Sequence, residues 1–418
     1  MRHLSLLALL LVGTSFLGAQ KANDNPYPYP YGNPVITHMY TADAAPHVMP
    51  DGRVWMVTSV DHEEGGGYAT MHRYHTFSSA DMVHWIDHGE VLNVWQVLGS
   101  DQEPEGEDWA LWAPDMIYHQ GTYYLYFPIR ILHKDSLRDN GKRVVTSYTA
   151  VASSPSPDQP FTVINPRIEG TRGIDPSVFI DDDGEKYLYY GNHFGAKLAD
   201  NMMELATEPV HMEVNDKDFM EAIWMHKREG KYLVSYHRHY GKPIDPAKPD
   251  DPARGKSRLD FGVSDHPLGP FTYGGILNEE LGVGVEEGPR LSDHDFVPWR
   301  LYQSNHGGIV EFHGKDYLFY HTSALSSWRQ DAFQGPGTWT QRSVCVDEIT
   351  YDEGGNPQPV KQTLKGVNLV SVNQPYALEL RQQLSVMEGK ANISSAGVVE
   401  LEGPAVLRGG KVDLGSGY

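Results

Sequence analysis

Three carboxylates, Asp43, Asp175 and Glu221, occupy the same place in a pattern that recurs along the chain. Each lies nine residues before a turn glycine that opens a run of β-branched and aromatic residues: 52 − 9 = 43, 184 − 9 = 175 and 230 − 9 = 221. A carboxylic acid that donates a proton and a carboxylate that activates water together suffice to hydrolyse a glycosidic bond. Mutual repulsion and partial burial would keep one such group protonated while its neighbour stays ionised.

A tryptophan and a histidine occupy the corresponding place in two further copies of the pattern. Trp112 lies nine residues before Gly121, and His306 lies eight residues before Gly314 (121 − 9 = 112, 314 − 8 = 306). Each of the five copies has the pattern of a strand, a hairpin turn and a second strand rich in aromatic residues. A strand pair repeated five times predicts a five-bladed β-propeller, in which equivalent positions converge on a central axis.

The propeller is expected to span residues 33–366, because this whole stretch shares one character. Short runs of Val, Ile, Tyr, Phe and Trp alternate with Gly, Pro, Asp and Asn turns, so the fold class is all-β. The first strand pattern begins near 33–36, and inner strands are expected at 44–49, 114–118, 176–180, 222–227 and 308–312. Third strands are expected at 69–74, 148–152 and 258–263. Trp85 is expected to pack between blades.

Four stretches depart from the repeated pattern. Residues 1–19 have a basic start, an apolar run and a small-residue cleavage site, which predicts a signal peptide and a secreted or periplasmic protein. Residues 130–144 and 240–257 are expected to be irregular insertions, either walls of a pocket or surface loops. Residues 367–418 are expected to form a short C-terminal β segment, either the start of a carbohydrate-binding β-sandwich module or a tail that docks on the propeller.

Composition restricts the partners of the protein. Removal of residues 1–19 takes away Arg2 and no acid, which leaves 34 − 1 = 33 basic against 55 acidic residues, a net charge of −22. Such a surface repels nucleic acid and anionic membranes and suits a neutral ligand, although acidity also keeps an exported protein soluble. The single cysteine, Cys345, excludes an internal disulfide framework. We therefore expect no nucleic-acid or membrane partner.

Each of the three carboxylates also has a structural interpretation, because aspartates cap backbone amides in turns. Their shared offset argues against it, whereas Asp51 and the aspartates at 181–183 lie in the turns themselves and are interpreted as structural. Glu286 and Glu287 are rivals for a catalytic acid, but they lack the offset.

The segments around these positions resemble the motifs of the family 43 glycoside hydrolases. Residues 40–43, 112–115, 173–177, 221–224, 305–312 and 341–347 stand in the order of that family, and the resemblance covers roughly 33–367. It implies a five-bladed β-propeller that hydrolyses glycosides with inversion of anomeric configuration. It further implies that Asp43 is the general base, that Glu221 is the general acid, and that Asp175 raises the pKa of the acid and holds it in position.

The resemblance also implies roles for three other residues. His306 would contact a hydrated structural calcium ion near the axis, or else be a buried, hydrogen-bonded histidine, since calcium prefers oxygen ligands. Arg342 would donate hydrogen bonds to the sugar, or else form a surface ion pair. Trp112 would form an apolar wall of the sugar subsite, or else pack between blades. No cofactor is required for the chemistry.

The implied substrate is a plant polysaccharide or oligosaccharide that contains pentoses. An α-L-arabinofuranosidase or a β-xylosidase is the leading expectation, and galactosidases and endo-arabinanases are alternatives within the family. A noncatalytic carbohydrate-binding propeller would need the aromatic residues and Arg342, but not three carboxylates. A sialidase-like hydrolase, prompted by residues 78–85, ranks low because the repeated Ser-x-Asp-x-Gly-x-x-Trp pattern and an obvious arginine triad are missing from the sequence.

Overall fold

The computed structural model describes residues 32–62, 71–191, 193–240, 256–278, 306–322, 325, 341–363 and 365–370, with four short strands between 384 and 409. The expected signal peptide at 1–19 and the rival acids Glu286 and Glu287 lie outside these residues. The described ranges include the short helix α1 (Val94–Leu98), and no helix in them is long and apolar enough to cross a membrane.

Five antiparallel sheets, here called blades one to five, follow one another along the chain. Blade one contains β1 (Thr41–Val48), β2 (Val54–Val60), β3 (Arg73–Ser79) and β4 (Ile86–Asn93). Blade two contains β5 (Glu107–Leu111), β6 (Asp115–His119), β7 (Thr122–Leu137), β8 (Arg143–Ser154) and β9 (Thr162–Asn165). Each blade is thus built from strands that are neighbours in sequence.

The remaining three blades continue this order. Blade three contains β10 (Ser177–Ile180), β11 (Lys186–Tyr190), β12 (Phe194–Lys197) and β13 (Val210–His211). Blade four contains β14 (Phe219–Arg228), β15 (Lys231–Tyr240), β16 (Lys256–Ser264) and β17 (Thr272–Asn278). Blade five contains β18 (Gly308–Phe312), β19 (Lys315–Thr322) and β20 (Ser343–Ile349).

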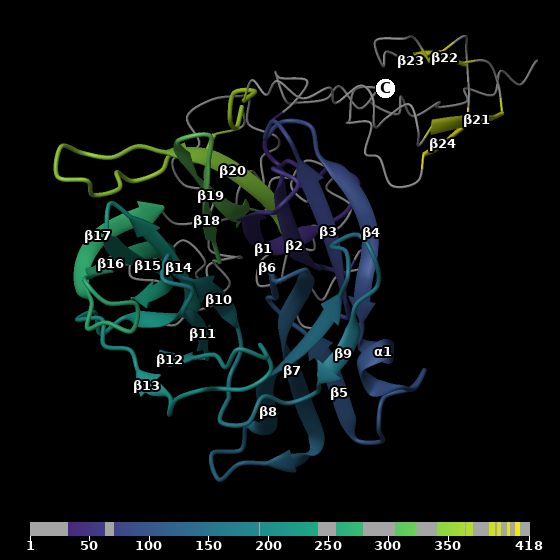
Figure 1. Ribbon diagram of the computed structural model, residues 1–418. Coiled ribbons are helices and arrows are strands. Elements are labelled where there is room, and N and C mark those ends of the chain that lie inside the picture. Colours follow the sequence, from purple (N-terminus) through teal and green to yellow (C-terminus); the bar gives the residue numbers. More distant parts are fainter. Residues whose placement is uncertain are drawn as a thin grey trace, which may run out of the picture.

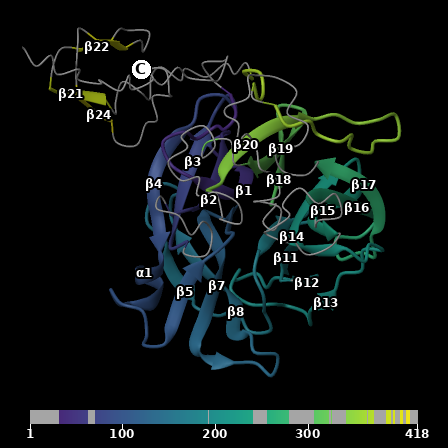
Figure 2. The same ribbon diagram turned by 180° about the vertical axis from the view of Figure 1, so that it is seen from behind.

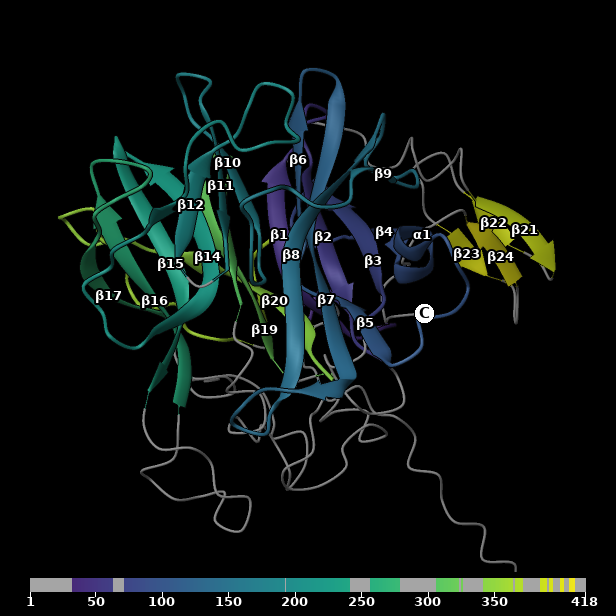
Figure 3. The same ribbon diagram turned by 90° about the horizontal axis from the view of Figure 1, so that it is seen from below.

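One strand of each blade takes part in a closed ring around a common centre (Figures 1 and 2). β1 contacts β6, β6 contacts β10, β10 contacts β14, β14 contacts β18, and β18 contacts β1 again. The view from below in Figure 3 shows β1, β6, β10 and β14 of this ring. This is a five-bladed β-propeller, and the fold class predicted from the repeats is confirmed. The five predicted inner strands coincide with the strands of the ring to within a few residues.

The glycines that marked the repeats all adopt the left-handed backbone conformation, with φ between 76° and 87°; they are Gly52, Gly121, Gly184, Gly230 and Gly314. A Cβ atom at any of them would meet nothing within 4 Å. The turns therefore favour glycine because of backbone conformation and not because of crowding, and this is why the sequence marks them so regularly.

Several strands are buried on both faces, because each blade is covered by its neighbours. β2 is buried along its whole length, and β19 is buried at every residue after its first. Trp85 of the blade-one loop packs edge-to-face on Phe319 of blade five, with ring centroids 5.8 Å apart. The expected packing of Trp85 between blades is thereby confirmed.

Buried carboxylates tie one blade to the next. Asp115 in β6 lies 2.7 Å from Nε2 of His47 in blade one and accepts the backbone N–H of Val178 in blade three at 2.6 Å. Asp181, in the turn of blade three, accepts hydrogen bonds from Lys227 and Tyr232 of blade four. These contacts give Asp181 the structural role expected from its place in the turn.

The N-terminal segment closes the ring against blade five. The expected strand at 33–36 is wrong in type, because these residues form no strand. The Val35 N–H nevertheless donates to the Val344 carbonyl at 2.9 Å, and the Asn33 side chain bonds both the N–H and the carbonyl of Val346. The Asn33 side chain therefore makes hydrogen bonds to β20 that the backbone of a paired strand would otherwise have made.

Two further expectations are corrected by the strand boundaries. Residues 130–144 are not an irregular insertion, since β7 and β8 continue through them as a long antiparallel hairpin, and β5 pairs with the extended part of β7. The third strand of blade one begins at Arg73 and not at 69. Mixed charge concealed the hairpin, because its solvent-facing positions break the apolar alternation. The insertion at 240–257 lies mostly outside the described residues.

The C-terminal region contributes four short strands in two separate pairs. β21 (Leu384–Glu388) pairs with β24 (Val406–Gly409), and β22 (Ala391–Ile393) pairs with β23 (Val399–Leu401). The β character expected after residue 367 is therefore present in the described part of this region. Its interpretation as a binding module or as a docking tail stays a prediction.

Candidate active site

The backbone itself directs the predicted carboxylates toward the centre of the ring. Asp43 and Asp175 adopt left-handed φ values of 54° and 55°, and Ala222, directly after Glu221, adopts 62°. The pairing of β1 with β2 shifts register between residues 42 and 45, and that of β14 with β15 shifts between 221 and 224. Such bulges re-aim side chains and store strain, and Asp tolerates the left-handed region better than most residues.

Arg342 joins blade five to Asp43. Its Nη1 donates to Oδ1 of Asp43 at 2.9 Å, while Nε and Nη2 donate to the two oxygens of Asp61 at 3.0 and 2.7 Å. Arg342 is 1% exposed, so the alternative of a surface ion pair is wrong. Paired donors in a fixed fork hold both the guanidinium and the carboxylate in place.

The pKa of Asp175 is strongly perturbed by its surroundings. Burial raises the pKa of Asp175 well above its usual value, and the negative charges of Glu221 and Asp43 raise it further. The Ala222 backbone N–H and the charge of Arg342 act in the opposite direction without offsetting the rise. The site therefore retains a proton beside Glu221 at a pH where an exposed aspartate has lost its own.

Glu221 is the most accessible of the three, with 16% of its side chain exposed against 5% for Asp43. Its Oε1 lies 3.3 Å from Nδ1 of His237, a side chain that is fully buried on the neighbouring strand β15. The Glu221 carboxyl group is thus held at one oxygen by His237 and is partly exposed to solvent, so it can still reach a ligand.

His306 is buried within electrostatic range of Asp43 and Glu221. Burial lowers its pKa, the charges of Asp43 and Glu221 act to raise it, and those of Arg342 and His237 to lower it. Among the residues that the structure describes, no three His, Cys, Asp or Glu side chains are grouped as metal ligands. Calcium takes about six to eight oxygens, so these side chains build no direct calcium site, and an ion beside His306 would depend on its own water.

Trp112 is half-buried beside this group, after the end of β5. The guanidinium of Arg130 lies over its ring, 4.6 Å from the centroid, and its carbonyl accepts a hydrogen bond from Tyr74 at 2.6 Å. Asp43 and Asp175 both raise the pKa of Tyr74, after the larger effect of burial. Tyr74 thus links the Trp112 backbone to the surroundings of Asp43 and Asp175, and the role of Trp112 as an apolar wall for a sugar stays a prediction.

Three residues of the site were missed by sequence reasoning, namely Asp61, His237 and His321. Asp61 directly follows β2, and the two histidines each lie seven residues after a turn glycine: 230 + 7 = 237 and 314 + 7 = 321. Counting forward from the glycines, as well as backward, would have found the histidines. Asp61 carries no such signal, because its partner Arg342 is distant in sequence.

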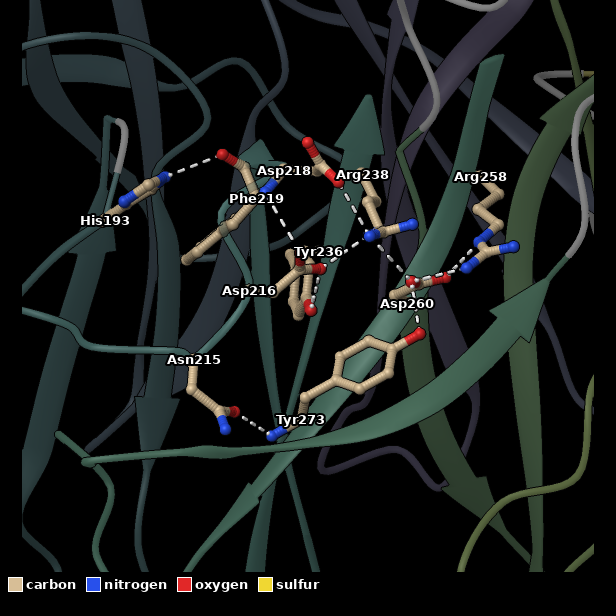
Figure 4. A network of polar contacts seen from close by, with 10 residues as sticks. All are labelled: His193, Asn215, Asp216, Asp218, Phe219, Tyr236, Arg238, Arg258, Asp260 and Tyr273. Atoms are coloured by element: carbon tan, nitrogen blue, oxygen red, sulfur yellow. Dashed lines mark hydrogen bonds and ion pairs between the residues drawn. The ribbon is translucent and has the colours of Figure 1, made fainter. Parts of the chain in front are cut away.

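A second polar network joins the segment before β14 to β15 (Figure 4). Nε of Arg238 in β15 donates to Asp216 at 2.7 Å, and its Nη2 donates to Asp218 at 2.8 Å. Tyr236 also donates to Asp216, at 2.9 Å. These bonds fix the chain just before β14 against β15, the pair of strands that carries Glu221 and His237.

A β-propeller whose centre gathers three carboxylates and an arginine has the groups that a glycoside hydrolase requires. Residues 31–242 match the family described as Glycosyl hydrolases family 43, and the chain belongs to that family. The protein is therefore a glycoside hydrolase, and the recognition from its motifs is confirmed.

Curated relatives and solved structures agree with this assignment. A xylosidase/arabinosidase 43A of Humicola insolens is 32% identical over 383 residues, which is 77% of this chain and 97% of the relative. A xylosidase/arabinosidase of Bacteroides ovatus is 30% identical, over 76% of this chain and 93% of the relative. A family 43 β-xylosidase/α-arabinofuranosidase from a compost microbial metagenome, solved with xylotriose, is 27% identical, with a TM-score of 0.57 over 78% of this chain and 96% of that chain.

The raised pKa of Asp175 predicts that this residue costs stability at neutral pH. An acid whose pKa is higher in the folded than in the unfolded state contributes stability below the unfolded value of 3.8, and this is lost as pH rises through the folded value. Asp175→Asn should therefore raise Tm at pH 7, by roughly 1–2 °C per kcal/mol removed for a domain of this size, and the gain should disappear near pH 4. Thermal unfolding between pH 4 and 8 measures this.

Asp183→Asn is the matched control for this prediction. Asp183 lies exposed in the turn of the same blade and accepts the Glu185 backbone N–H at 2.9 Å. The Asp183 variant should show no gain in Tm that grows with pH. A Tm difference for Asp175→Asn that is the same at every pH, or negative at pH 7, would contradict the assigned cause.

Proposed function

We propose that the protein is an inverting α-L-arabinofuranosidase or β-xylosidase that acts on pentose-containing plant polysaccharide or its oligosaccharides. The observation that carries the proposal is the meeting of Asp43, Asp175 and Glu221 at one site, where Glu221 is the most accessible of the three carboxyl groups. The names of the relatives from Humicola insolens and Bacteroides ovatus support pentosides as substrates. The net charge of −21 favours a neutral ligand over nucleic acid.

In this proposal Asp43 is the general base. Its ion pair with Arg342 suits a group that must enter the reaction ionised, and a water molecule gives a proton to the Asp43 carboxylate as its oxygen attacks the anomeric carbon. The bond from that carbon to the leaving oxygen breaks at the same time. Attack from the opposite face inverts the configuration.

Glu221 is the general acid, and it transfers its proton to the departing oxygen. Asp175 lies beside it, and the two carboxyl groups repel one another when both are ionised. A proton therefore stays with this pair of carboxyl groups at a pH where an exposed aspartate has lost its own. Asp175 thereby keeps a proton available, and Trp112 and Arg342 would contact the sugar.

A panel of aryl α-L-arabinofuranosides, β-D-xylosides and β-D-galactosides tests the function, with proton NMR to follow the anomer that is released first. We expect turnover of at least one pentoside and release of the inverted anomer. Retained configuration would overturn the mechanism. Turnover of galactosides alone would overturn the substrate class, and binding of oligosaccharides with no turnover of any glycoside would favour the noncatalytic propeller.

We further propose that the signal at 1–19 directs export of the protein.

We also propose a structural calcium ion, held through water near His306, that takes no part in the chemistry. Exhaustive EDTA treatment should leave kcat within about twofold, because only a metal acting on the reacting atoms changes the barrier by several kcal/mol. Added calcium should raise Tm, and the rise should continue with the logarithm of the calcium concentration above the Kd. A Tm that is independent of calcium would contradict the ion, and a large loss of kcat that calcium alone restores would contradict its structural role.

A further inference from the structure

Two buried histidines occupy equivalent places on neighbouring blades. His237 in β15 and His321 in β19 each lie seven residues after the turn glycine of their blade (230 + 7 = 237, 314 + 7 = 321). Both side chains are 0% exposed. Each of them lies against a different carboxylate to which the proposed function gives a role.

His237 contacts Glu221 directly. The two residues face one another in the register of β14 and β15, and Nδ1 of His237 lies 3.3 Å from Oε1 of Glu221. The next residue, Arg238, holds the strand through Asp216 and Asp218 (Figure 4). Because side chains alternate along a strand, this network holds one face of β15, and His237 points to the other face, where it meets Glu221.

His321 contacts both the backbone and the side chain of Asp43. The Asp43 N–H donates to Nδ1 of His321 at 3.4 Å, and the same ring nitrogen lies 3.7 Å from Oδ1 of Asp43. Asp43 sits in the bulge of β1, where the register with β2 skips from residue 42 to 45. A buried N–H that leaves the ladder requires another acceptor, and His321 supplies one for a residue with a strained φ.

We propose that His237 and His321 are positioning residues for the acid and the base: His237 fixes the carboxyl group of Glu221, and His321 holds the left-handed backbone of Asp43. The inference rests on the proposed roles of Glu221 and Asp43. Both histidines act through these carboxylates and not on the sugar. Removing either should misplace one carboxylate while the other stays in place.

Leaving-group dependence separates the two effects. His237→Leu should lower kcat by about 10²-fold on glycosides with poor leaving groups, the loss expected for a displaced catalytic group. It should change kcat far less on 2,4-dinitrophenyl glycosides, because the dinitrophenolate leaving group departs without a proton. His321→Leu should lower kcat by about tenfold on both kinds of substrate, because water must be activated in either case.

Conservative variants distinguish positioning from general support of the fold. An asparagine amide nitrogen can stand near the place of Nδ1, whereas glutamine reaches the place of Nε2. His237→Asn should therefore recover most of the kcat that His237→Leu and His237→Gln lose. His226→Leu is the matched control, since His226 is a buried histidine of β14 whose Nε2 lies 3.3 Å from the buried Asp316, away from Glu221. This variant should lower Tm without changing leaving-group dependence.

Equal losses on both substrates for His237→Leu, or the same leaving-group pattern in His226→Leu, would overturn the role of His237. A His237→Asn variant no better than His237→Gln would overturn it as well. Unchanged kcat in a folded His321→Leu variant would overturn the role of His321. Full activity in Glu221→Gln or Asp43→Asn would instead defeat the proposed function itself, so the two failures are distinguishable.

Discussion

Asp43→Asn lowers kcat by about 10²–10⁴-fold, the contribution of a positioned general base, and leaves Tm almost unchanged. Asparagine tolerates the φ of 54° at this position, and its carbonyl oxygen can still accept the 2.9 Å hydrogen bond from Arg342. Asp61 continues to hold the guanidinium through both of its oxygens. The substitution therefore removes the base and little else.

The loss should be equal for good and poor leaving groups, because every substrate needs an activated water molecule. Steady-state kinetics on a dinitrophenyl and a methyl glycoside of the preferred sugar measure it, with thermal unfolding to show that the fold is intact. Asp51→Asn is the control, since Asp51 lies in the turn of the same blade and accepts the Trp55 indole N–H at 2.8 Å. A folded Asp43→Asn enzyme with more than about a tenth of the kcat would contradict the base assignment.

Glu221→Gln should show a loss that depends on the leaving group. On substrates with poor leaving groups we expect kcat to fall by about 10²–10⁴-fold, because glutamine cannot protonate the departing oxygen. On dinitrophenyl glycosides the loss should be less than about tenfold, because the phenolate leaves without a proton. The slope of log kcat against the leaving-group pKa should therefore become steeper in the variant.

A slope that does not change would contradict the assignment of Glu221 as the acid. The double variant Glu286→Gln, Glu287→Gln is the appropriate comparison, because these residues were the rival acids in the sequence. It should keep the slope of the unsubstituted enzyme. The opposite result, with a steeper slope in the double variant alone, would move the acid to that segment.

The fold could be read from the sequence because its signals are local. Five glycines with φ near 80° mark the hairpins, and the strands beside them carry the aromatic and β-branched residues that such strands favour. Errors arose where the local signal was weak. Residues 130–144 look irregular because exposed strand residues are charged, and 33–36 look like a strand although one Asn33 side chain makes the bonds to Val346.

The sequence by itself determined the repeat, and through the repeat the common offset of Asp43, Asp175 and Glu221. Only the tertiary structure decided what surrounds them. Arg342 and Asp43 are 299 residues apart, and the closure of the ring brings them to 2.9 Å. The raised pKa of Asp175 likewise depends on burial and on charges from other blades. Turn geometry is encoded within a few residues, whereas burial and charge proximity are properties of the closed ring.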